Sequence, residues 1–207
     1  CGYEYEENVG TSISLLAIGS SHTMNSITYF GDICEAAGID NVYLGHMYKG
    51  GVTFQQQYED ATGIDTNGDG VTSHTFSYRT YDNSKWSAYT SGKHVAEVVG
   101  SDDWDYIVLN QGAIDAPLYG QELANGDVRD TFDTYFDWEI DYIRGLAPDA
   151  TLCWNMTFAC EEYETGDPRY NECDLRWQYK NWFNFDSQLM YKGIVGALNK
   201  YVLPEER

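Results

Sequence analysis

Basic residues are scarce in this sequence. It has 12 Lys and Arg against 33 Asp and Glu, which gives a formal net charge of −21. Proteins that bind nucleic acid present basic side chains to the phosphates, so this balance argues against nucleic acid as a partner. An acidic surface keeps a protein soluble, and we favour this interpretation over a specific cation-binding role for the whole surface.

The sequence also lacks an apolar run of the roughly 20 residues needed to cross a bilayer. None of its five cysteines forms a C-x-x-C pair, so zinc binding and thiol redox chemistry have little support. Cys153 lies in an apolar segment and is predicted to be a buried small side chain. Cys160 and Cys173 flank a polar segment and are candidates for a disulfide in an exported protein.

Cys1 begins the sequence, and no signal peptide stands before it. One interpretation is a lipid-modified N-terminus of a mature protein, which would anchor the chain at a membrane surface. The other is that Cys1 is only the residue with which an expressed segment begins. In both cases we expect a secreted or cell-surface protein.

Apolar and amphipathic segments alternate along the chain, and 43% of the 207 residues are hydrophobic, which is typical of a folded domain with a core. The predicted strands are 13–18, 41–47, 105–110 and 151–156. The predicted helices are 25–38, 54–61, 92–99, 132–146 and 177–203. This alternation predicts an α/β fold with a mostly parallel sheet. Residues 63–90 interrupt it, and the runs 75–80 and 85–89 predict a small hairpin insertion. No linker is visible, so residues 1–207 are predicted to form a single domain.

The segment from Ile13 to His22 is the one most suggestive of chemistry. It runs from an apolar strand into the turn Gly19-Ser20-Ser21, and a helical pattern follows. In open α/β folds such a turn lies at the carboxyl edge of the sheet, where ligands bind. A serine hydroxyl and free backbone N–H groups at that place provide a nucleophile and oxyanion donors for acyl transfer.

Five segments, in order along the chain, resemble landmarks of one superfamily. They are 17–21 (AIGSS), 48–53 (YKGGVT), 103–111 (DWDYIVLNQ), 154–159 (WNMTFA) and 186–191 (DSQLMY). Together they resemble the SGNH-hydrolase (GDSL-esterase) superfamily, and above all an uncharacterised bacterial branch that opens with A-I-G-N-S-F. Ser20 and His22 stand where that branch usually has Asn and Phe. The resemblance implies a three-layer α/β/α sandwich with a flavodoxin-like sheet.

By this resemblance Ser21 would be the nucleophile. The oxyanion hole would consist of its own N–H, the N–H of Gly51 or Gly50, and the side chain of Gln111 or Asn110. The superfamily cleaves esters, often acetyl groups on carbohydrates, and uses a histidine to activate the serine. The resemblance therefore implies a carbohydrate or other ester as the substrate, and no required cofactor.

The D-x-x-H block that supplies the superfamily's base is missing: none of the four histidines follows an Asp by three residues. A serine without a base is a poor nucleophile. His46, near the end of a predicted strand, is a candidate substitute base, and His22 is a candidate substrate contact. Either the domain is C-terminally incomplete, or it is a non-catalytic surface, adhesion or assembly module, for which self-assembly is an option.

A second motif resembles the first half of a calcium loop. The oxygen-supplying positions are occupied by Asp65, Asn67, Asp69 and Val71. Gly70 occupies the glycine position, but Phe76 stands where such a loop has its bidentate Glu. The site would be completed only by a distant carboxylate such as Asp60 or Asp82. The alternatives are a Ca²⁺ site and a solvated turn, and the sequence leaves both open.

Overall fold

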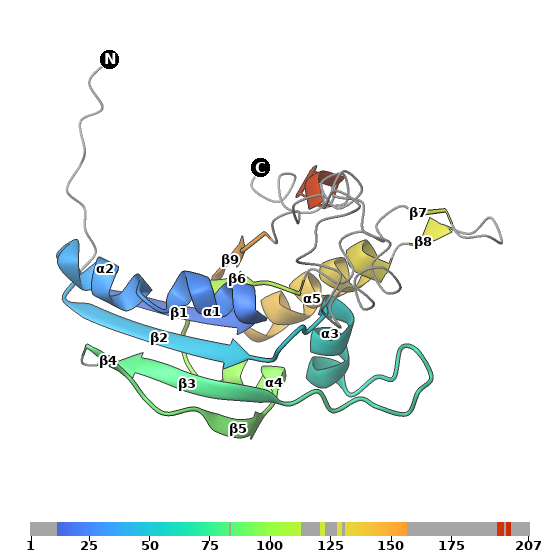
Figure 1. Cartoon of the computed structure of the whole chain (residues 1–207), viewed down its shortest axis with the longest axis horizontal. Helices are drawn as coiled ribbons and strands as arrows, with labels where there is room; N and C mark the ends of the chain where they lie inside the picture. Colours follow the sequence, from blue (N-terminus) through green and yellow to red (C-terminus); the bar gives the residue numbers. More distant parts are fainter. Residues whose placement is uncertain are drawn as a thin grey trace, which may run out of the picture.

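The computed structural model describes residues 12–82, 84–112, 121–122, 128–129, 131–156, 194–196 and 198–199 (Figure 1). The strands are β1 (Ser12–Gly19), β2 (Asn41–Tyr48), β3 (Phe76–Asp82), β4 (Lys85–Trp86), β5 (Thr90–Lys93), β6 (Tyr106–Leu109), β7 (Gln121–Glu122), β8 (Val128–Arg129) and β9 (Thr151–Trp154). The helices are α1 (Ser21–Ile27), α2 (Phe30–Ala36), α3 (Phe54–Thr62), α4 (Val95–Val99) and α5 (Thr131–Leu146).

The main sheet has seven strands in the order β4-β3-β2-β1-β6-β9, with β5 also paired to β3. Strands β2, β1, β6 and β9 are parallel, whereas β3 is antiparallel to β2. The parallel order, in which β1 lies between β2 and β6, is that of flavodoxin-like sheets. The predicted α/β fold with a mostly parallel sheet is therefore confirmed. Strands β7 and β8 form a separate two-stranded ribbon.

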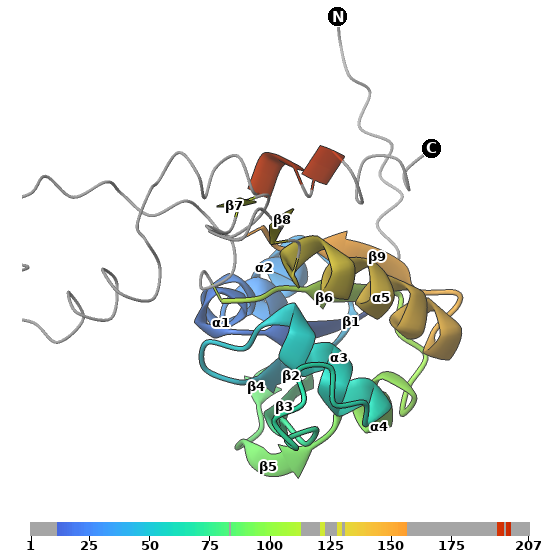
Figure 2. The same ribbon diagram turned by 90° about the vertical axis from the view of Figure 1, so that its right-hand side faces the viewer.

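Helices cover both faces of the sheet (Figure 2). Side chains alternate between the two faces along a strand, so β1 contributes to two cores. Leu16 and Ile18 belong to the larger core, which also contains buried side chains of α3, α4 and α5. Leu15 and Ala17 belong to the smaller one, with side chains of α1 and α2.

The first helix begins earlier than predicted and is divided. In place of one helix over 25–38, the chain forms α1 and α2, with a break at Thr28 and Tyr29. The prediction of an N-cap near Asn25 was wrong because Ser20 takes that role: its Oγ accepts a hydrogen bond from the N–H of His22 at 3.4 Å. As a result Ser21 is the first residue of a helix that follows β1 after a single residue.

The predicted hairpin is present as β3 and β4. It pairs with β2 along β3, so it extends the main sheet with antiparallel strands. Residues 90–93, partly predicted as helix, form β5, and α4 begins only at Val95. Gly92 has φ +81°, a conformation that favours glycine and does not fit a helix.

Two further predictions concern cysteines and the C-terminal part of the chain. Cys153 is only half-buried, so the prediction of a buried side chain was wrong. Its strand, β9, has β6 as its one neighbour among the described strands. Cys1, the Cys160–Cys173 pair, residues 177–193 of the last predicted helix and the segment 186–191 lie outside the described residues.

Candidate active site

Ser21 lies at the carboxyl edge of the parallel strands. Strand β1 ends at Gly19, Ser20 is buried beneath the turn, and Ser21 is exposed as the first residue of α1. The first N–H groups of a helix have no intrahelical acceptor, so backbone donors lie beside the Ser21 hydroxyl. The side chain of Ser21 has no hydrogen-bond partner within the part of the chain that the structure describes.

Asn110, which follows β6, holds this turn in place. It is fully buried, and its Oδ1 accepts hydrogen bonds from the Ser20 hydroxyl at 2.8 Å and the Thr23 hydroxyl at 3.1 Å. Its Nδ2 donates to the carbonyl of Asn155, after β9, at 2.8 Å. One amide therefore joins the ends of three strands. Because Nδ2 donates to a backbone carbonyl, the geometry favours Asn110 as a positioning residue for the serine turn.

The glycine-rich turn after β2 lies next to the same edge. The N–H of Lys49 donates to the carbonyl of Gly19 at 3.0 Å, and the N–H of Val52 donates to the carbonyl of Lys49 at 3.3 Å. Gly51, at φ +64°, sits in this turn and packs against Gly112, where an added Cβ would lie 3.1 Å from the Gly51 Cα. The turn thus approaches the ends of both β1 and β6.

Gln111 is also buried and fixes the start of α3. Its Oε1 accepts a hydrogen bond from the N–H of Phe54 at 3.1 Å. Gln57 of α3 donates from Nε2 to the Asn110 carbonyl at 2.7 Å. Three separate segments of the sequence therefore meet at one edge of the sheet, where their strands are neighbours. They contribute the predicted site residues Ser21, Gly51, and Asn110 with Gln111.

His46 lies in a different environment from the one expected of a base. It is fully buried in β2, and its Nδ1 is 3.0 Å from the hydroxyl of Tyr89. Burial, with the positive charge of Arg79, lowers the pKa of His46 to about 3. Such an imidazole is a weak proton acceptor at neutral pH. His22, half-buried in α1, also has its pKa lowered by burial.

The other two histidines pair with carboxylates that the sequence did not indicate as their partners. Nε2 of His74 lies 3.0 Å from Oε2 of Glu59, and Nδ1 of His94 lies 2.9 Å from Oδ1 of Asp60. The second carboxylate oxygen of Asp60 accepts from the N–H of Val95 at 2.9 Å. These pairs attach the segment before β3 and the start of α4 to the end of α3. The partners of these two pairs are 15 and 34 residues apart in the sequence, so no local pattern indicates that they meet.

The loop predicted to bind calcium is closed by its own backbone. Asp65 accepts hydrogen bonds from the N–H groups of Gly68 and Gly70 at 2.7 and 2.9 Å, and these donors lower its pKa. The carboxylate of Asp60, proposed to complete the site, instead contacts the imidazole of His94 and the N–H of Val95. The described residues contain no group of three His, Cys, Asp or Glu side chains that could hold a metal. Calcium binding stays a prediction, which titration calorimetry with Ca²⁺ tests.

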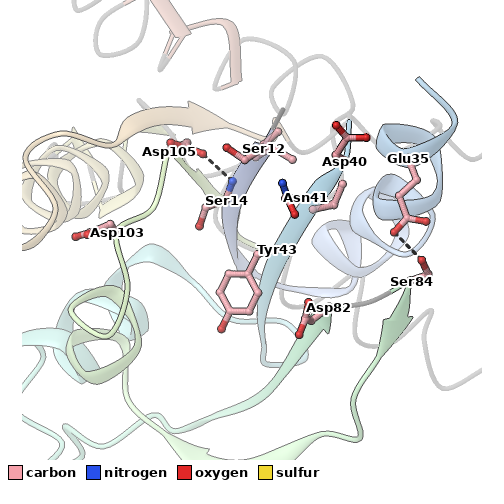
Figure 3. A pocket seen from close by; sticks show the side chains of 12 residues that line it. Ser12, Ser14, Glu35, Asp40, Asn41, Tyr43, Asp82, Ser84, Asp103 and Asp105 are labelled. Carbon is pink, nitrogen blue, oxygen red and sulfur yellow. Dashed lines mark hydrogen bonds between the residues drawn. The ribbon is translucent and has the colours of Figure 1, made fainter. Parts of the chain in front are cut away.

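An acidic cavity of about 510 Å³ lies at the opposite edge of the sheet, at the amino ends of β1 and β2 (Figure 3). The carboxylates that line it are Glu35, Asp40, Asp82, Asp103 and Asp105. Asp105 accepts a hydrogen bond from the N–H of Ser14 at 2.7 Å. Open α/β sheets bind their ligands at the carboxyl edge, so this cavity is not part of the candidate site.

Comparison with known proteins supports the fold. No protein-family model and no curated protein matches the chain. Among solved structures it is similar to a DUF4886 family protein from Bacteroides uniformis ATCC 8492, with a TM-score of 0.65 and 21% sequence identity. The match covers 91% of this chain and 62% of the other, so this chain spans less than two thirds of that protein's length. At this identity the similarity shows a shared α/β fold.

No helix among the described residues is long and apolar enough to span a membrane.

Proposed function

We propose that this chain is an SGNH-type serine esterase domain that acts on acyl esters of carbohydrates. The observation that carries the proposal is Ser21, an exposed hydroxyl on the first residue of a helix at the carboxyl edge of a parallel sheet. The Gly51 turn and the Asn110–Gln111 segment lie at the same edge. This is where acyl transfer in an open α/β fold requires a nucleophile and oxyanion donors.

In the proposed reaction the Ser21 oxygen attacks the carbonyl carbon of the ester and transfers its proton to a base. The N–H groups of Ser21 and Gly51, with the side chain of Gln111, stabilise the oxyanion, and Asn110 positions the serine turn. Collapse of this intermediate expels the sugar alcohol, which takes up the proton, and leaves an acyl group on Ser21. Water then attacks the acyl-enzyme and releases the carboxylic acid. The superfamily's base belongs to an Asp-x-x-His block that this sequence does not contain, and the proposal assigns no residue to that role.

The decisive experiment combines an ester assay with covalent labelling. A fluorophosphonate reacts with an activated serine, so we expect its mass on the Ser21 peptide and Ser21-dependent release of acetate from acetylated xylan. Ser21→Ala should abolish both. Ser26→Ala is the matched control, because Ser26 lies on the exposed part of the same helix and its hydroxyl donates only to the His22 carbonyl and accepts from Asn155. A folded protein that shows neither labelling of Ser21 nor Ser21-dependent turnover would exclude the esterase.

A second candidate function is a non-catalytic SGNH-fold module for surface attachment, adhesion or assembly. The observation in its favour is that three of the histidines make their polar contacts with groups other than Ser21. His46 contacts Tyr89, and His74 and His94 contact carboxylates. Saturable glycan binding or self-association that persists in Ser21→Ala, in a protein without turnover, would support this function.

A further inference from the structure

Arg79 of β3 is held by aromatic rings and has no acidic partner among the described residues. Its guanidinium carbon lies 4.2 Å from the ring centroid of Trp86 and 4.7 Å from that of Tyr89. Its Nε is buried and makes no hydrogen bond with the described residues. Among those residues no carboxylate pairs with Arg79, although the chain has 33 Asp and Glu. A half-buried arginine without a counter-ion is unusual in so acidic a protein.

The described groups next to Arg79 do not neutralise its charge. Arg79 and His46 are directly paired on neighbouring strands, and the positive charge contributes to the low pKa of His46 after burial. Burial raises the pKa of the Tyr89 hydroxyl, and Arg79 opposes that shift. His46 is neutral, and its Nε2 is buried without a partner among the described residues. Within the described part of the chain, the cluster therefore holds one positive charge and one imidazole nitrogen without a hydrogen bond.

The aromatic rings around Arg79 are themselves fixed. Trp86 donates from Nε1 to the carbonyl of Thr28, just after α1, at 3.1 Å. Tyr89 contacts His46 through its hydroxyl, and its ring centroid lies 6.3 Å from that of Tyr48. Tyr89 is 38% exposed, and Tyr48 and Trp86 are half-buried, so the cluster reaches the surface. It is a preorganised patch that combines rigid ring area with one cation.

We propose that Arg79, Trp86 and Tyr89 form a binding site for a carboxylate-bearing sugar of the uronate class. The planar fork of a guanidinium matches a carboxylate and binds it through two parallel hydrogen bonds. Tyr and Trp offer rigid area for the apolar face of a sugar ring and polar tips for its hydroxyls. A single cation suits a single negative charge, whereas the net charge of −21 repels polyanions such as nucleic acid.

This site is independent of the proposed esterase chemistry, because none of its residues belongs to the Ser21 turn, the Gly51 turn or the Asn110–Gln111 segment. It lies on β3, β4 and the segment between β4 and β5. Binding can therefore be tested in a protein whose serine has been removed, and the failure of one proposal leaves the other standing.

Titration calorimetry with glucuronate, and with glucose as the uncharged ligand, tests the proposal on the full chain. We expect saturable binding of glucuronate, no comparable heat with glucose, and a loss of at least about tenfold in affinity in Arg79→Gln. Lys93→Gln on β5 is the matched control: it removes the same charge from a half-buried residue that is paired with Glu97, and it should leave affinity unchanged. Ser21→Ala should also bind as well as the original protein.

Further variants keep the test conclusive if Arg79→Gln does not fold. Arg79→Lys retains the charge but loses the planar fork, so we expect clearly weaker binding with unchanged melting. Tyr89→Phe should retain binding, because it keeps the ring. The proposal is overturned if glucuronate produces no saturable heat, if glucose binds equally well, or if the folded Arg79 variants bind as the original protein does.

Discussion

At the scale of single residues, Asn110 connects the ends of three strands. Its side chain makes four hydrogen bonds, to the N–H and hydroxyl of Ser20, the hydroxyl of Thr23 and the carbonyl of Asn155. Removing it would leave several buried polar groups without partners, and each such group costs about 1–3 kcal/mol.

We therefore expect Asn110→Ala to lower the free energy of unfolding by more than about 3 kcal/mol, measured by urea denaturation. Asn67→Ala, in the exposed turn after α3, is the control and should cost less than about 1 kcal/mol. A similar loss in both variants would show that Asn110 does not organise the strand ends.

Glu139 of α5 presents the opposite situation, a buried carboxyl group without a hydrogen bond to any described residue. Burial raises its pKa well above the ordinary 4.5, so the folded state retains a proton that the unfolded chain releases above that pH. The contribution of this bound proton to the free energy of unfolding is complete below about pH 4.5. It is lost as the pH rises toward the folded-state pKa of Glu139.

The replacement Glu139→Gln removes this titration. We expect the variant to be more stable than the original protein at pH 8 by at least about 1 kcal/mol, and the difference to shrink toward pH 4.5. Urea unfolding at several pH values measures it. A difference that does not change with pH would mean that Glu139 titrates normally in the folded protein.

At the scale of the elements, the junction of β1 with α1 is closely packed. A Cβ at Gly19 would lie 2.2 Å from the Thr23 hydroxyl and 2.8 Å from the backbone oxygen of Asn110. The close approach of Thr23 and Asn110 to this position leaves no room for a side chain.

We predict that Gly19→Ala pushes α1 away from the sheet, lowers the free energy of unfolding by about 2 kcal/mol or more, and reduces any Ser21-dependent turnover. Gly145→Ala is the control, since a Cβ there meets nothing within 4 Å and alanine favours the helix α5. Chemical denaturation of both variants measures the difference. Equal stability of the two would contradict the close packing.

On the scale of the whole molecule, the excess of acidic residues dominates. A net charge of −21 opposes the compact state by self-repulsion, and the ion pair of Lys93 with Glu97 lies on the surface, where such pairs contribute little.

Added NaCl should therefore raise the melting temperature at pH 7, since the screening length falls from about 30 Å at 0.01 M to about 8 Å at 0.15 M. Thermal unfolding followed by circular dichroism checks this. Melting that falls as NaCl is added would mean that attractive pairs outweigh the repulsion.

Local patterns in the sequence were enough to indicate most elements of the fold. Apolar runs such as Leu15–Ile18 predict strands, and alternation with amphipathic segments predicts a mostly parallel sheet, because both signals depend on residues close in the chain. The first helix was predicted to start near Asn25, whereas the Ser20 side chain caps α1 and its hydroxyl also donates to Asn110, 90 residues away.

The sequence by itself determined the class of fold, the acidic surface and the serine turn after β1, because each depends on composition or on neighbouring residues. Only the tertiary structure decided which distant groups meet. It placed Asn110 under the serine turn, His46 against Tyr89, His94 against Asp60, and Arg79 between the aromatic rings of a neighbouring strand and segment. Pairings across a sheet depend on strand order and register, which no local pattern specifies.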